Sequence, residues 1–130
     1  MNTVEFQIKH SEIIKQYQFI EHDLEGIFGL LEHGNFEELT HRVENDTMGE
    51  LIRKVKFLIK ENKVNYLDKN DFNILEQIRY NRNYWAHQCY LDIHEEKNKY
   101  DEIAKRLTNE LKVAEDMNAK LRSIFVRIKK

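Results

Sequence analysis

Apolar residues recur every three or four positions along most of the chain, which is the spacing of one face of an α-helix. In residues 3–33 this stripe comprises Ile13, Tyr17, Ile20, Leu24, Ile27 and Leu31. Three further apolar residues widen it, namely Ile14, Phe28 and Leu30. We therefore expect one long helix that packs against two neighbours and stops at Gly34, a residue suited to a left-handed helix end.

A short helix is expected over residues 36–44, where three apolar residues share a face, and the polar stretch ENDT ends it. Thr47 with Glu50 three residues later is the pattern of a capping box, in which each side chain accepts the other's backbone N–H. The pattern predicts a third helix that begins there and ends near Glu61.

The polar link ENKVNYLDKND follows, and either Asp68 or Asn70 is suited to cap a helix over residues 71–91. From about His94 a last long helix continues toward the end of the chain. Its apolar stripe comprises Tyr100, Ile103, Leu107, Leu111, Ala114, Met117, Leu121, Ile124 and Ile128. The pattern thus predicts four main helices and one short helix.

The composition indicates the same class of fold. The 130 residues include no proline and only four glycines, so β-structure with its turn residues is not expected. A chain of this length favours a single domain, here residues 1–130. We expect an all-α protein, an antiparallel helical bundle of four main helices plus one short helix. The stripes on the first and last helices leave a coiled-coil dimer open as the less favoured arrangement.

Cysteine content, charge and hydropathy restrict the expected location of the protein and the ligands it is expected to bind. The single Cys89 forms no intramolecular disulfide, which favours a reducing, cytoplasmic location. We expect neither a signal peptide nor a membrane span, because no stretch approaches about 18 apolar residues. A net charge of −2 argues against a non-specific binder of duplex DNA. The histidines show no metal-ligand spacing such as HExxH, so no metal site and no cofactor are expected.

The stretch RNYWAH, residues 82–87, breaks the pattern of its helix. The apolar stripe of that helix comprises Leu75, Ile78, Arg82, Trp85, Ala86, Cys89 and Ile93, with the arginine in its middle. A buried guanidinium without a partner is very costly. Arg82 therefore either forms a structural ion pair, with Glu21, Asp23 or Glu25, or lines a cleft or an interface with another subunit.

His87 follows Arg82 by five residues, which is about 140° around a straight α-helix. Asn83 shares the face of His87, because the two are four residues apart. The long Arg82 side chain could reach this face, most easily near a helix end or a kink. Arg79 adds a second cation one turn earlier, and Tyr84 adds a hydroxyl.

These residue types suit chemistry on a phosphodiester. An imidazole transfers protons near neutral pH. A guanidinium binds phosphate oxygens and stabilises the charge that develops on them. RNA supplies its own nucleophile, the 2′-hydroxyl, so no metal is needed. One histidine per chain is one acid–base group short, and two copies of the helix across a twofold axis would supply both.

The motif resembles the signature of the HEPN superfamily: an arginine, a polar residue directly after it, and a histidine after four to six intervening residues. The family fold is a small helical bundle with the motif on a late helix. Many members are metal-independent endoribonucleases that cleave RNA as homodimers with one composite cleft. They commonly act as toxins of toxin–antitoxin systems or in phage defence, which implies an RNA substrate and a possible antitoxin partner.

The resemblance implies a role for each residue of the motif. Arg82 would bind phosphate and stabilise charge, His87 would transfer protons, and Asn83 would orient one of them or the RNA. Some toxin members carry a tyrosine shortly after the histidine, and Tyr90 is the nearest candidate here. Together with Arg79 and Tyr84 it completes the expected substrate-binding residues.

Two other functions remain open. Some HEPN members lack nuclease activity and bind a nucleotide or a partner protein such as a nucleotidyltransferase, which would make Arg82 a phosphate anchor or a structural ion. In the second alternative function, the chain is a plain helical interaction protein and the motif is accidental.

Residues outside the motif leave further alternatives. Trp85 is expected in the core or at a dimer interface, with base stacking as a less favoured role. The densest basic run is expected to be a solvated helix face, or else an RNA track, and comprises Arg53, Lys54, Lys56, Lys60 and Lys63. Basic residues near the C-terminus are expected to interact with the helix dipole or with RNA, and comprise Lys120, Arg122, Arg127, Lys129 and Lys130.

Overall fold

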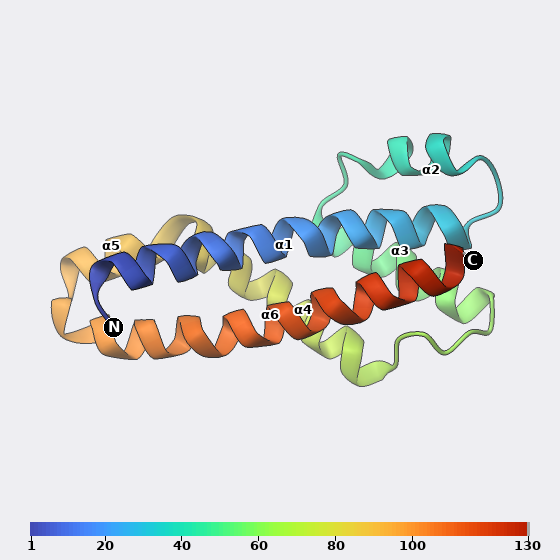
Figure 1. Cartoon of the computed structure of the whole chain (residues 1–130). Coiled ribbons are helices and arrows are strands. Elements are labelled where there is room, and N and C mark those ends of the chain that lie inside the picture. The colour runs from blue at the N-terminus through green and yellow to red at the C-terminus, as the bar shows by residue number, and fades with distance from the viewer. Residues whose placement is uncertain (130) are drawn as a thin grey trace.

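The computed structural model describes residues 1–129, and over that range the chain is helical with no strand, which confirms the all-α prediction (Figure 1). The α-helices are α1 (Thr3–Leu31), α2 (Phe36–Val43), α3 (Met48–Glu61), α4 (Lys69–Asn83), α5 (Cys89–Glu95) and α6 (Tyr100–Lys129). A π-helical turn, Tyr84–Gln88, joins α4 to α5, and a 3-10 turn, Lys97–Lys99, precedes α6. Lys130 lies outside the described residues. None of the helices in residues 1–129 combines the length and apolar composition that a membrane span requires.

Polar side chains begin the helices where the sequence suggested. The predicted capping box of α3 is present, with Thr47 and Glu50 each accepting the other's backbone N–H. Of the two candidates for α4, Asp68 is the cap, and it forms a second capping box with Asp71. The predicted end of the first helix was wrong by two residues: the backbone is already extended at the residue after Leu31, and Gly34, with φ +139°, lies in the loop.

The two long helices run parallel, which contradicts an antiparallel arrangement for this pair (Figure 1). At one end the Tyr100 hydroxyl donates to the Asn2 carbonyl at 3.1 Å. Further along both helices Asn118 Nδ2 donates to Gln16 Oε1 at 2.8 Å. The reason is that α4, the π-turn and α5 together carry the chain back along the whole molecule, so α6 starts beside the N-terminus.

Helix α4 runs antiparallel to α6 and is tied to it by polar contacts. Near its start both Asp71 carboxylate oxygens accept from Lys120 Nζ at 2.7 Å, and near its end Asn81 Oδ1 accepts from Arg106 Nη2 at 3.4 Å. Burial by itself would raise the pKa of Asp71, but hydrogen bonds from Lys120 and from the Asp68 backbone lower it below its usual value. Lys120 therefore serves the fold, a role that the sequence did not indicate.

The core lies where the apolar stripes predicted it. All six stripe residues of α1 are buried, and so are those of α6 apart from the half-buried Tyr100 and Ile128 at its two ends. The two helices approach closely at Gly26, where a Cβ atom would lie 2.5 Å from the Phe125 ring. The stripes thus face neighbouring helices within one chain, and the coiled-coil dimer is not needed to bury them.

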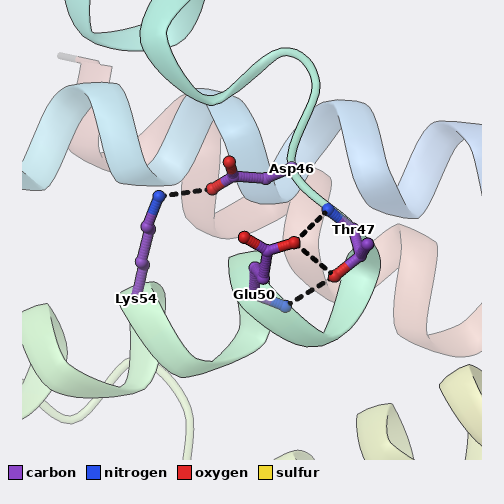
Figure 2. A network of polar contacts seen from close by, with 4 residues as sticks. All are labelled: Asp46, Thr47, Glu50 and Lys54. Atoms are coloured by element: carbon purple, nitrogen blue, oxygen red, sulfur yellow. Dashed lines mark hydrogen bonds and ion pairs between the residues drawn. The ribbon is translucent and has the colours of Figure 1, made fainter.

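The cap of α3 also orders the loop before it (Figure 2). Thr47 Oγ1 accepts from Glu50 N at 3.2 Å, while Glu50 Oε1 accepts from Thr47 N at 3.2 Å and from its hydroxyl at 3.0 Å. These hydrogen bonds lower the pKa of the Glu50 carboxyl. Lys54 reaches back from the next turn to Asp46, so the chain is held on both sides of the helix start.

We predict that Thr47→Ala lowers the free energy of unfolding by about 1 kcal/mol, because it removes the acceptor of an orphan N–H and half of the capping box. Urea denaturation followed by circular dichroism measures this. Thr108→Ala is the control, because Thr108 lies within α6, where its hydroxyl bonds only to the Ala104 carbonyl. Equal losses in the two variants would contradict the role of the cap.

Candidate functional site

The helix that carries the motif contains an extra residue in one turn. The Cys89 N–H donates to the Tyr84 carbonyl, five residues back rather than the four of an α-helix. In a π-turn, residues five apart come close to the same side of the helix. The turn therefore brings His87 toward Arg82, which a straight helix would place about 140° away. The sequence allowed for a kink but did not locate it.

A histidine of α1 holds the π-turn. Since the Cys89 N–H is engaged elsewhere, the Trp85 carbonyl lacks its usual α-helical donor. It accepts from His10 Nε2 at 2.6 Å and from Cys89 Sγ at 3.5 Å. A carbonyl only accepts, so His10 carries its proton on Nε2. The His10 ring is fixed in turn by an edge contact with Tyr90, with ring centroids 4.9 Å apart.

Trp85 anchors the same turn from inside the core. Its side chain is 0% exposed, and its Nε1 donates to Glu110 Oε1 of α6 at 2.8 Å. This confirms the core position and leaves the ring inaccessible to a nucleobase or to a second subunit. Cys89, one turn later, is also buried as expected, and burial raises the pKa of its thiol.

Beside the π-turn lies an open cleft of about 590 Å³ between α4 and the start of α3. It is lined by Thr47, Met48, Gly49, Arg53, Arg79, Arg82, Asn83, Ala86 and His87. The structure thus brings four of the predicted site residues together, two arginines among them. Asn83 and His87 are exposed and Arg82 is half-exposed, so the motif is open to a ligand.

An acidic residue of a neighbouring helix restricts the position of Arg82. Its guanidinium forms an ion pair with Glu21 of α1, one of the three partners that the structural alternative named. The Arg82 side chain is nevertheless 39% exposed and the Glu21 side chain 22%. A guanidinium carries five N–H donors, and one carboxylate occupies at most two of them. Donors remain for an anion in the cleft.

Two further arginines line the cleft. Arg79 crosses the start of α3, where a Cβ atom on Gly49 would lie 3.0 Å from its Cδ, and it pairs with the exposed Glu76 at 2.9 Å. Arg53 is exposed and has no ion-pair partner within residues 1–129. The sequence placed Arg53 only in a basic run. Arg53 lies one helical turn after Gly49, on the same side of α3. Once the start of α3 is known to lie beside the motif, this spacing places Arg53 at the cleft as well.

The two tyrosines of the predicted site lie elsewhere. The Tyr84 ring packs under the Arg106 guanidinium, 4.2 Å from ring centroid to Cζ, and faces α6. Burial and the neighbouring Asp92 carboxylate raise the pKa of Tyr84 to about 12. Tyr90 packs against Phe6 of α1 and lines a separate groove. The structure therefore does not bring either tyrosine to the Arg82 cleft.

Three other basic residues near the C-terminus also have partners in the fold, while Lys130 lies outside the described residues. Arg122 pairs with the buried Asp23 at 3.4 Å. Arg127 lies over the Tyr66 ring at 4.8 Å, and Lys129 lies over the Phe125 ring. These contacts are with side chains rather than with the helix dipole.

We predict that His10→Phe lowers the free energy of unfolding by about 1 to 3 kcal/mol, because it keeps an aromatic ring but leaves the part-buried Trp85 carbonyl with only the weak Cys89 thiol as a donor. Urea denaturation measures the change. His10→Gln is the matched control, since its amide retains an N–H donor, and it should lose less. A His10→Phe protein as stable as the wild type would show that the bond does not hold the π-turn.

No family model, no curated protein and no solved structure matches the chain.

Proposed function

We propose that the chain is a metal-independent endoribonuclease of the HEPN type. The observation that supports it best is the π-turn, because it turns Arg82 and His87 toward one open cleft with Arg79 and Arg53. Three guanidinium groups beside an exposed imidazole suit a phosphodiester better than any uncharged substrate.

In the proposed reaction the RNA 2′-hydroxyl attacks the adjacent phosphorus, and the bond to the 5′ oxygen of the next nucleotide breaks. The products are a 2′,3′-cyclic phosphate and a free 5′-hydroxyl. Arg82 binds the non-bridging oxygens and stabilises their growing charge. His87 transfers one of the two protons, either from the 2′-hydroxyl or to the leaving oxygen. Asn83, one turn before His87, orients the imidazole or the phosphate.

The second proton requires a second acid–base group. We propose that it is His87 of another copy, in a homodimer whose composite cleft is formed by two motifs. The HEPN likeness, a bundle built on α1, α3, α4 and α6, and a cytoplasmic toxin or phage-defence setting with an antitoxin partner are parts of the same proposal. They rest on the resemblance of the motif.

One observation favours a second candidate. The ion pair of Arg82 with Glu21 is also what a structural arginine would form. A non-catalytic module that binds a nucleotide or a partner protein, such as a nucleotidyltransferase, would use the same basic cleft as a phosphate anchor without proton transfer. Arg79, Arg53 and the remaining Arg82 donors would then provide binding alone.

Purified protein is predicted to cleave a mixed RNA in the presence of EDTA. Arg82→Ala and His87→Ala should each lower the cleavage rate about 100-fold or more, because charge stabilisation and proton transfer each contribute that much. Gel analysis of the products measures the rate, and circular dichroism checks folding. His33→Ala, an exposed histidine of the α1–α2 loop, is the control.

One result would count against the nuclease and another against the composite site. Saturable nucleotide binding that needs Arg82, without cleavage, would favour the second candidate. Cleavage by a protein that light scattering shows to be strictly monomeric at micromolar concentration would contradict the composite site.

The Glu21 carboxylate is expected to position the Arg82 guanidinium rather than to stabilise the fold. Glu21→Gln should lower kcat/KM for RNA about tenfold, while the free energy of unfolding changes by no more than about 1 kcal/mol, as for other partly exposed ion pairs. Kinetics and urea denaturation of the same preparation compare the two quantities. A clear loss of stability with unchanged kcat/KM would assign the pair to the fold alone.

A further inference from the structure

A second groove adjoins the candidate cleft. Its volume is about 420 Å³, and it lies between α1, α2 and α3. It is lined by Phe28, Glu32, Arg42, Arg53, Lys54, Phe57 and Leu58. Arg53 lines both the cleft and the groove, so the two meet at this side chain.

The shared wall of the two hollows is one face of α3. Gly49, Arg53 and Phe57 succeed one another every four residues, and each step advances about 6 Å along the helix axis. The face therefore extends about 12 Å from the cleft to Phe57. Phe57 is 60% exposed, so its ring is open to a ligand in the groove.

The groove is rich in cations although the whole chain has a net charge of −2. Arg42 of α2 and Arg53 are both exposed. Lys54 is committed to Asp46 (Figure 2) and lies 6.0 Å from the centroid of the buried Phe28 ring. Two guanidinium groups that form no ion pair within residues 1–129 thus line the groove together with one exposed aromatic ring, and Glu32 contributes a carboxylate to the lining.

This combination fits single-stranded nucleic acid. Guanidinium groups contact successive phosphates, and an exposed aromatic ring stacks on an unpaired base. A duplex keeps its base faces covered, so Phe57 would contribute little to binding it. An apolar segment of another protein would cover the two guanidinium groups that border the ring without giving them an anionic partner.

We propose that single-stranded RNA occupies this groove as the continuation of the substrate in the cleft. One base stacks on Phe57, and the backbone phosphates contact Arg53 and Arg42. The identity of the ligand rests on the proposed function, since the scissile phosphate lies at Arg82 and His87. The ribonuclease then selects unpaired RNA, because only an unpaired strand can bind in the cleft and also stack a base on Phe57 in the groove.

Binding of a short 2′-O-methyl oligouridine of about 10 nucleotides tests this. The probe cannot be cleaved, so fluorescence anisotropy gives its Kd at several salt concentrations. Phe57→Ala should weaken binding about tenfold at every salt concentration and leave the salt dependence unchanged. Arg53→Gln should reduce the slope of log K against log salt by about 0.7, the value for one single-strand phosphate contact.

Two substitutions away from the groove are the controls. Phe19→Ala removes a phenylalanine of α1 that is 45% exposed, and Lys105→Gln removes an exposed cation of α6. Both should bind the probe as the wild type does. A duplex of the same chemistry should bind more weakly than the single strand and should be indifferent to Phe57→Ala.

The outcomes separate this proposal from the proposed function. If the wild type cleaves RNA but Arg53→Gln and Phe57→Ala bind like the controls, the groove proposal is overturned and the nuclease stands. Binding that depends on both residues, without cleavage that depends on Arg82 and His87, supports the groove and removes the nuclease. If Phe57→Ala leaves RNA binding intact and turns a dimer into a monomer in light scattering, the groove is a protein interface and the proposal fails.

Discussion

The Trp85 carbonyl oxygen receives its hydrogen bond from His10, a residue 75 positions away, because the helix that contains it has taken one extra residue into a turn. Without this bond the carbonyl would keep only the weak Cys89 thiol as a donor, at a cost of about 1 to 3 kcal/mol. The bond therefore stabilises the π-turn against relaxation to a regular α-helix. The indole of Trp85, bonded to Glu110, fixes the same turn from the side of α6.

The relative positions of the exposed side chains on and before that turn depend on this extra residue. With the extra residue, Arg82 and His87 approach one face and share a cleft with the start of α3. Without it, the imidazole would be rotated away from the guanidinium. π-turns are frequent at functional sites because they aim side chains that a regular helix cannot bring together.

The exposure of the Arg82–Glu21 ion pair indicates whether the pair mainly stabilises the fold or mainly positions the guanidinium. A deeply buried ion pair costs several kcal/mol when one partner is removed, whereas an exposed pair contributes about 0 to 1 kcal/mol. At 39% and 22% exposure both side chains of the Arg82–Glu21 pair are partly open to solvent, but the paired Glu21 Oε1 is itself buried, so the pair lies between the two classes. It restricts where the guanidinium lies, which suits a group that is proposed to meet a phosphate at a fixed position.

The apolar spacing predicted the first three helices and the buried faces of α1 and α6 well, because burial repeats every turn of a helix. It was wrong about the start of the last helix, which begins at Tyr100 rather than near His94, and it did not separate α5, Cys89–Glu95, from α4. The Thr47 cap was also readable, since a capping box is local. The parallel course of α1 and α6 was not, because periodicity specifies a face and not a direction. The π-turn was missed for a related reason: its stabilising donor, His10, lies on another helix. Arg53 could not be assigned to the site from the sequence, because only the packing of α3 on α4 brings it there.

In the proposed site Arg82 and His87 contact one and the same anion. The ¹⁵N NMR signals of the Arg82 Nε and the His87 imidazole can be followed while inorganic phosphate is added. Both signals should shift with a single Kd, and His87→Ala should weaken the binding reported by Arg82. A shift of one signal without the other, or two unrelated values of Kd, would contradict the proposed site.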